Sequence, residues 1–245
     1  MLKNIYLGLK FSFSYFSIFP INFKKSDDLS SETILASMLL FFPLVGLTLG
    51  IGSVVLFSYL EYLEWYGALF SALLYMILYG FIHTEAIADV ADALYASHSG
   101  KDAYKIIKEP TIGAMGLLYA IALVILKVAG ILFLFTHGFL LEFLSIVVVS
   151  RLSLLLLFKL HTFRSSFATQ LKNAFTLPYV AVAFAIFTLL GIVFLSQFIL
   201  LLVAGLLLSL LISYSIKAKL GFVNGDVLGA TLEGVEILLL LGVAL

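Results

Sequence analysis

Cysteine is absent from the sequence, and charged residues are scarce. Without cysteine the chain can form neither disulfides nor thiolate metal sites, so carboxylates and histidines are its only strong metal ligands. Charged residues make up 11% of the 245 positions, and 14 bases balance 14 acids, so no basic excess indicates a nucleic-acid partner. A cleavable leader pattern is also missing, because Lys3 and Lys10 are spread through the first turns and no small-residue cleavage site follows an apolar core.

The residues that dominate instead are apolar. Hydrophobic side chains make up 63% of the chain, and the mean hydropathy is +1.18. A soluble domain of this length could not bury that much apolar surface, so lipid must surround much of it. The composition therefore predicts an integral membrane protein.

Long apolar segments set the expected architecture, an all-α polytopic bundle of about six to seven transmembrane helices in one domain, residues 1–245. Pro43 interrupts the first segment and predicts a kink within one span. Residues 1–20 predict an amphipathic interfacial helix that ends before Pro20. Residues 226–245 carry three acids, and we expect them to enter the bundle without crossing fully. The six expected spans are 34–60, 65–83, 113–135, 139–158, 178–195 and 198–216.

The basic residues predict the orientation. Of the 14 Lys and Arg residues, only Lys127 and Arg151 fall within spans. The other twelve lie in the N-terminal segment and in connections that share one side of the membrane, 21–33, 84–112, 159–177 and 217–225. This bias predicts that the N-terminus and the polar loops are cytoplasmic.

An acidic stretch interrupts the apolar pattern after the second span. Glu85, Asp89 and Asp92 follow at i, i+4 and i+7, which on a helix confines them to an arc of roughly 60°. Stacked like charges repel, so either a hard cation such as Mg²⁺ lies between them or they are a solvated helix end. On a continuous helix His83 would lie about 160° from Glu85, which favours a structural or indirect role unless the helix breaks.

A basic and glycine-spaced segment follows. Lys101, Lys105 and Lys108 repeat at helical spacing and fit either phosphate groups or anionic lipid; Lys108 adjoins the turn and fits both. Gly113 and Gly116 could expose backbone N–H groups to an anion at the start of a helix, or simply permit close helix packing.

A second acidic seam lies near the C-terminus. Asp226, Glu233 and Glu236 share one helical face after Asn224 and Gly225. Acids next to hydrocarbon are costly, so we expect a partner, with Mg²⁺ as the candidate. Arg151 and Arg164 would contact either a substrate phosphate or one of these acids. Together these groups favour a metal-dependent reaction on a diphosphate.

Several of these stretches resemble the signatures of one known family, the cobalamin synthases or adenosylcobinamide-GDP ribazoletransferases. The main resemblance is His83-x-Glu85-Ala86-x-Ala88-Asp89-x-x-Asp92, followed by Ile106-Ile107-Lys108-Glu109-Pro110-x-Ile112-Gly113-Ala114-x-Gly116. Further agreement lies at Phe42–Gly50, Ser150-Arg151 and Gly225–Ala230 with Glu236 beyond. Glu85 stands where the family has Asp, Ala86 where it has Gly, and Thr111 where it has Arg.

The resemblance implies a multi-pass enzyme of the bacterial inner membrane that uses Mg²⁺ in the last steps of vitamin B12 nucleotide-loop assembly. It would join α-ribazole, or its 5′-phosphate, to adenosylcobinamide-GDP and release GMP, with other enzymes of that assembly as potential partners. We expect catalysis from Glu85, Asp89, Asp92 and Asp226, and metal binding from these four with Glu233 and Glu236. We expect phosphate binding from Lys108, Gly113, Gly116, Arg151, Arg164, Asn224 and Gly225.

Two other classes fit parts of the pattern. A membrane phosphotransferase acting on nucleotide-activated alcohols also clusters aspartates at a helix end, but its usual core needs an Arg that is missing after Ala88. A cation-coupled transporter would place its carboxylates near the bilayer midplane on broken helices. The positions of the acids distinguish these classes.

Overall fold

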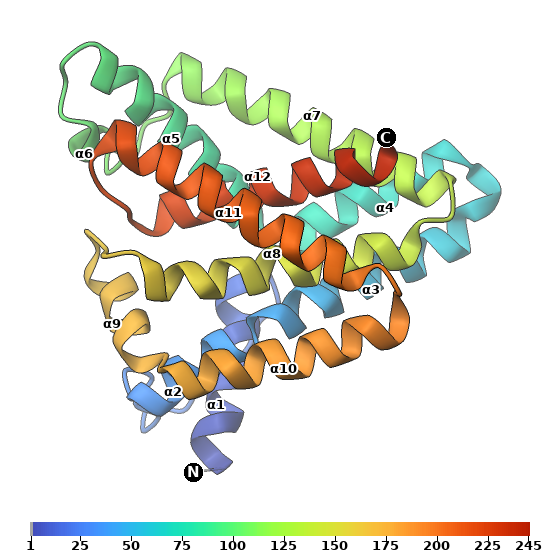
Figure 1. Cartoon of the computed structure of the whole chain (residues 1–245), viewed down its shortest axis with the longest axis horizontal. Helices are drawn as coiled ribbons and strands as arrows, with labels where there is room; N and C mark the ends of the chain where they lie inside the picture. The colour runs from blue at the N-terminus through green and yellow to red at the C-terminus, as the bar shows by residue number, and fades with distance from the viewer. Residues whose placement is uncertain (1) are drawn as a thin grey trace.

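α-Helices account for most of residues 2–245, which the computed structural model describes, and no strand occurs among them (Figure 1). The all-α prediction is confirmed. The helices are α1 (Leu2–Phe16), α2 (Glu32–Leu40), α3 (Phe42–Leu60), α4 (Trp65–Leu78), α5 (Ile82–His98), α6 (Ala103–Ile106), α7 (Ala114–Thr136), α8 (Leu140–Leu160), α9 (Ser166–Ala174), α10 (Leu177–Phe194), α11 (Phe198–Leu220) and α12 (Gly225–Ala244), with a short 3₁₀ turn, η1, at Glu61–Leu63.

Six helical segments are long and apolar enough to cross a membrane, and a bent pair could add a seventh. The number of spans agrees with the prediction, but the six segments are not all the ones that the sequence predicted. The expectation that 226–245 would not cross is wrong by this measure, because α12 is one of the six. The six are Phe42–Leu63, Ala114–Thr136, Leu140–Leu160, Leu177–Phe194, Phe198–Leu220 and Gly225–Ala244.

The predicted span 65–83 is interrupted, because α4 ends at Leu78 and α5 begins at Ile82 at an angle of 79° to it. Gly80 and Phe81 both adopt positive φ angles, +65° and +54°, and Phe81 is in the left-handed region as it caps α5. Glycine tolerates this conformation, whereas a phenylalanine rarely adopts it. The chain therefore turns sharply just before the acidic stretch.

The predicted single span 34–60 is also divided in two. α2 ends at Leu40, and α3 begins at Phe42 with Pro43 in its first turn. Proline lacks an N–H group, which a first-turn residue does not need for intrahelical bonding, so it starts a helix here rather than kinking one. The helical prediction for the N-terminal segment agrees with α1, which ends before Pro20.

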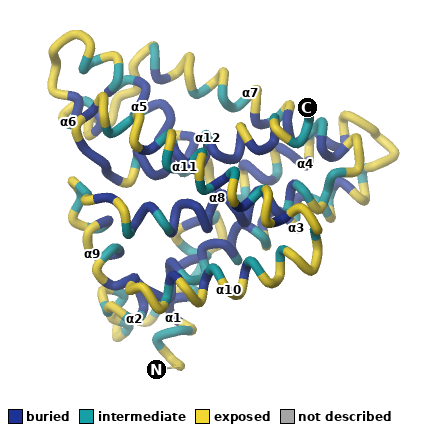
Figure 2. Tube along the Cα trace, viewed as in Figure 1, coloured by how far each residue is buried: buried dark blue, intermediate teal, exposed yellow. Residues whose placement is uncertain are grey.

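Among the six candidate spans, burial is greatest along α8 and along α12 (Figure 2). α7, α10 and α11 instead expose large apolar side chains on their outer surfaces, including Leu118, Val193 and Leu207. A water-soluble protein would not expose so much continuous apolar surface, whereas lipid solvates it without cost. At one end of the bundle lie α6, α9 and the connection 221–224, on the left in Figure 1; we call this end the loop face.

Candidate functional site

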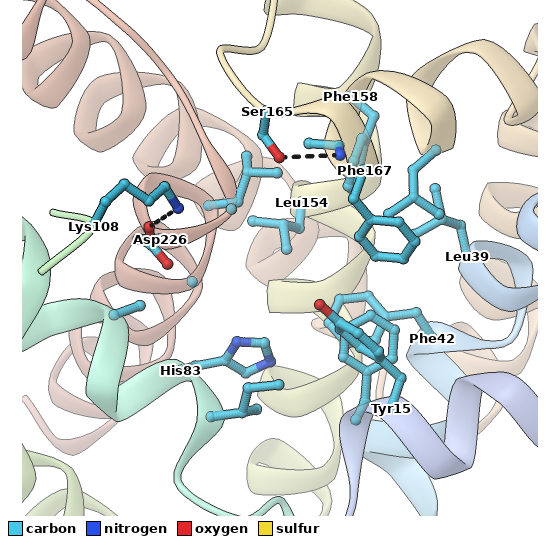
Figure 3. Close-up of a pocket in the computed structure, with 18 residues that line it drawn as sticks. Tyr15, Leu39, Phe42, His83, Lys108, Leu154, Phe158, Ser165, Phe167 and Asp226 are labelled. Atoms are coloured by element: carbon cyan, nitrogen blue, oxygen red, sulfur yellow. Dashed lines mark hydrogen bonds and ion pairs between the residues drawn. The ribbon is translucent and has the colours of Figure 1, made fainter. Parts of the chain in front are cut away.

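A cavity of about 290 Å³ opens at the loop face, where α1, α5, α8, α9 and the first turn of α12 converge (Figure 3). Segments from both halves of the sequence supply its walls. The lining residues are Tyr15, Phe16, Leu39, Phe42, Ile82, His83, Ala86, Lys108, Leu154, Phe158, Ser165, Phe167, Ala168, Leu171, Gly225, Asp226, Leu228 and Gly229. Of the predicted site residues, Lys108, Gly225 and Asp226 therefore meet in one cavity.

Asp226 is the centre of the polar wall. Its Oδ2 accepts a hydrogen bond from the Asn224 side-chain amide at 2.6 Å and lies 3.5 Å from the Lys108 ammonium group. The Asn224 side-chain oxygen accepts the Val227 N–H at 3.0 Å and so caps α12. A lysine and the first turn of a helix thus flank one carboxylate, an arrangement that attracts anions as well as holding the acid in place.

The acids of α5 approach Asp226 from the neighbouring helix. α5 is not itself one of the six candidate spans, and Asp89 lies on it half-buried, whereas Glu85 is exposed. Burial, followed by repulsion from the carboxylates of Asp226, Glu85 and Asp92, raises the pKa of Asp89 to about 6. The α5 acids and Asp226 therefore form one electrostatic group, although only Asp226 lines the cavity.

Asp92 has a partner that the sequence analysis did not predict. Its two carboxylate oxygens accept the backbone N–H groups of Gly113 and Gly116 at 2.6 Å and 2.7 Å, at the start of α7. The backbone N–H groups of this turn thus bind an anion, which is one of the two interpretations offered by the sequence. The anion is a carboxylate of the chain itself and not a phosphate. A Cβ atom at either glycine would collide with Asp92, which explains the two glycines.

His83 faces the cavity because α5 begins afresh after the bend. Because α5 is continuous from His83 to Glu85, the two side chains point to different sides of it, as expected: His83 lines the cavity, whereas Glu85 is exposed and does not. The indirect role expected for His83 stays a prediction. The imidazole is 7% exposed, and its ring centroid lies 6.1 Å from those of Phe42 and Tyr79. The neighbouring Ala86 packs against Gly229 of α12, where an added Cβ would lie 2.8 Å from the Ala86 methyl group.

Arg164 lies exposed beside the cavity, in the connection between α8 and α9. Its guanidinium carbon is 3.8 Å from the Tyr104 ring centroid and 5.7 Å from that of Phe222. The Tyr104 hydroxyl donates to the Arg164 carbonyl at 2.9 Å, and the Arg164 N–H donates to the Val223 carbonyl at 2.8 Å. Stacking holds the guanidinium plane and leaves its edge open to solvent, where it can contact an anion.

The predicted second acidic seam is not assembled at the cavity. Glu233 and Glu236 are buried in the middle of the bundle, where Lys127 lies 2.7 Å from an oxygen of each. Arg151 donates to Glu236 at 2.6 Å and to the Tyr75 hydroxyl at 3.2 Å. For Arg151 the structure shows the structural pairing that the sequence had left open. The sequence does hold a signal for this pairing. Lys127 and Arg151 are the only basic residues in the predicted spans, so they are the natural partners of the two buried acids.

The chain is similar to known proteins over nearly its whole length. The family described as cobalamin-5-phosphate synthase matches residues 8–244. The chain belongs to this family. Among its relatives are proteins named adenosylcobinamide-GDP ribazoletransferase from Clostridium perfringens (27% identical, 99% of this chain and 100% of the relative), Chlorobium phaeovibrioides (29%, 94% and 94%) and Syntrophobacter fumaroxidans (31%, 93% and 94%). No solved structure shows significant similarity to the chain.

The arrangement of acids in this family member bears on metal binding. Within residues 2–245, no three acidic or histidine side chains are close enough to coordinate one ion by themselves. Magnesium in phosphate-transfer sites is often held by one or two carboxylates and completed by substrate phosphate oxygens and water. The mutually repelling carboxylates of Asp89 and Asp226, supplied on two helices, fit that mode of binding.

Proposed function

We propose that the protein is an adenosylcobinamide-GDP ribazoletransferase that joins α-ribazole, or its 5′-phosphate, to adenosylcobinamide-GDP and releases GMP. The observation that carries this proposal is the family match over residues 8–244, shared with full-length relatives of that name. The cavity supports it, because a lysine, a helix start and a carboxylate occupy one wall, as transfer at a diphosphate requires.

The reaction exchanges one phosphorus–oxygen bond for another. A ribose hydroxyl of the acceptor attacks the phosphorus next to the cobinamide, and the bond from this phosphorus to the oxygen of GMP breaks. Asp226 accepts the hydroxyl proton, since it is the carboxylate that lines the cavity. Lys108 and the guanidinium edge of Arg164 hold the phosphate oxygens and the charge that develops on GMP.

Magnesium is the proposed cofactor, with Asp89 and Asp226 as its protein ligands and Glu85 close by on the exposed side of α5. When bound, it would neutralise negative charge on the diphosphate. In this proposal Asp92 positions the site: by binding the start of α7 it fixes the helix that carries Asp89. Glu233 and Glu236 are left out of the metal site, because basic side chains already neutralise them.

The proposed location is the bacterial inner membrane, with the loop face in the cytoplasm. Twelve of the 14 basic residues lie outside the predicted spans, in the N-terminal segment and in the polar connections. The positive-inside rule favours this orientation, which would also expose the cavity to cytoplasmic nucleotides.

An assay of the purified full-length protein in lipid nanodiscs tests the function. We expect GMP release that requires both adenosylcobinamide-GDP and α-ribazole, and an adenosylcobalamin product. Asp226→Asn should slow turnover by about 10²–10⁴-fold, whereas Glu32→Gln, an exposed change on α2, should leave turnover unchanged. Absence of GMP release by the parent protein with both substrates and Mg²⁺, or full activity in Asp226→Asn, would refute the mechanism.

A further inference from the structure

The cavity has two chemically different walls (Figure 3). Lys108 and Asp226 form one side, and aromatic rings from four helices form the other. In the close-up the Lys108–Asp226 pair lies across the cavity from Tyr15 and Phe167. The aromatic residues of this second wall are Tyr15, Phe16, Phe42, Phe158 and Phe167.

The rings of the aromatic wall contact one another across helix boundaries. The Tyr15 ring centroid on α1 lies 5.6 Å from that of Phe167 on α9 and 4.9 Å from that of Phe16. The Phe16 and Phe42 centroids are 4.2 Å apart. A stack of this kind offers ring faces and edges to a flat aromatic ligand, which aromatic side chains bind by offset or edge contacts.

Few polar groups interrupt this wall. The side-chain polar groups beside it are the Tyr15 hydroxyl, the His83 imidazole and the Ser165 hydroxyl, whose Oγ accepts the Ala168 N–H. Burial and the Asp226 carboxylate raise the pKa of Tyr15, so its hydroxyl keeps its proton and can donate one hydrogen bond. The ring nitrogens of His83 have no hydrogen-bond partner among the described residues.

The small number of polar groups at the aromatic wall distinguishes between the two bases in the proposed reaction, which are guanine and dimethylbenzimidazole. Guanine carries several donors and acceptors on its edges, and each one buried without a partner costs about 1–3 kcal/mol. A dimethylbenzimidazole base has one free ring nitrogen and is otherwise apolar, so one or two polar groups satisfy it. Apolar phenylalanine rings therefore favour binding of dimethylbenzimidazole and disfavour binding of guanine.

We propose that the aromatic wall binds the benzimidazole base of the acceptor nucleoside and rejects purine nucleosides. The inference rests on the proposed function and names the part of the cavity that selects the acceptor. With the base against Tyr15 and Phe167, the attached ribose extends toward Asp226 and Lys108. The attacking hydroxyl thereby reaches the carboxylate that takes its proton.

Binding and turnover should be measured separately on the full-length protein in nanodiscs. Equilibrium dialysis with labelled α-ribazole, and with the α-linked adenine nucleoside, measures binding without any reaction. We expect the adenine nucleoside to bind at least about tenfold more weakly, since one unsatisfied polar edge suffices for that difference. Tyr15→Ala and Phe167→Ala should each raise the KM for α-ribazole about tenfold and change the KM for adenosylcobinamide-GDP less than about twofold.

Tyr6→Ala is the matched control, because Tyr6 is an exposed tyrosine on the same helix that does not line the cavity. Tyr15→Phe separates the ring from the hydroxyl and should retain most of the affinity. Equal binding of the two nucleosides, or a rise in the KM for adenosylcobinamide-GDP in place of that for α-ribazole, would overturn the inference. Selective α-ribazole binding without GMP release would refute the proposed reaction and leave the binding site standing.

Discussion

The ammonium group of Lys127 on α7 lies 2.7 Å from a carboxylate oxygen of Glu233 on α12, with each side chain 1% exposed. Glu236 shares Lys127 at the same distance and also pairs with Arg151 on α8. Charges withdrawn from water this completely are tolerated only when each has a partner of opposite sign. The network therefore joins three helices of the bundle at one point.

Replacing Lys127 with methionine should destabilise the protein strongly. Glu233 would then lose the basic partner that the structure gives it, whereas Glu236 would keep Arg151, and a broken buried pair typically costs about 3–5 kcal/mol. Denaturant unfolding of the detergent-solubilised protein measures the loss.

Lys219→Met, an exposed change on α11, is the control and should change stability little. The double variant Lys127→Met/Glu233→Gln removes one charge of each sign and should regain part of the loss. If Lys127→Met were as stable as the parent, the ion pairs would not hold the bundle together.

The glycine turn that binds Asp92 should not tolerate a methyl group. A Cβ atom at Gly113 would lie 2.6 Å from an Asp92 oxygen, and the collision at Gly116 is closer. Gly116→Ala should therefore cost about 1–3 kcal/mol, as overpacked sites do.

Gly242→Ala on α12 is the matched control, because a Cβ there meets nothing within 4 Å. Alanine favours helix by about 0.5–1 kcal/mol over glycine, so this variant should be unchanged or more stable. The same unfolding measurement serves both, and equal behaviour of the two variants would contradict the close contact with Asp92.

Lys108→Ala should weaken binding of the diphosphate substrate. Loss of one charge-assisted hydrogen bond to phosphate, worth about 1.5–3 kcal/mol, should raise the KM for adenosylcobinamide-GDP by roughly 10–100-fold. Steady-state kinetics with saturating α-ribazole checks this. Lys105→Ala removes a neighbouring exposed lysine that does not line the cavity and should leave the KM within about twofold, as surface changes usually do.

Removal of divalent metal should abolish turnover reversibly. Excess EDTA should stop GMP release, and added Mg²⁺ should restore it. Asp89→Asn should raise the Mg²⁺ concentration needed for half-maximal rate by at least about tenfold, because changes around metal ligands typically cost that much. Glu142→Gln, at the start of α8 and far along the chain from the acids, should titrate like the parent. Activity that persists in EDTA would exclude the proposed cofactor.

The sequence predicted those features that depend on composition and local spacing. Apolar segments of spanning length gave the helical membrane bundle, and the residues from His83 to Gly116 gave the family. Lys108, Gly225 and Asp226 were chosen from the sequence, and they do meet at one cavity. These features need no knowledge of which helices are neighbours.

Features that depend on helix breaks and on distant partners were not predicted. The turn at Gly80 and Phe81 leaves hydropathy unchanged, yet it brings His83 into the cavity. Asp92 and Gly113 are 21 positions apart, so their hydrogen bond follows from the packing of α5 against α7. The aromatic wall likewise combines Tyr15 with Phe167, which ordinary helical patterns would assign to separate apolar faces.

The single helix α12 carries both a carboxylate of the cavity and a carboxylate of the buried ion-pair network. Asp226 begins the helix at the cavity, and Glu236 is locked to Arg151 in the core. Ten residues of α-helix separate them by about 15 Å, so the ion pairs in the core fix the distance of Asp226 from the buried centre of the bundle. An insertion of one residue between them would lift Asp226 by about 1.5 Å and swing it by about 100° around the helix. The length of this helix segment therefore fixes how far the cavity carboxylate lies from the ion pairs in the core.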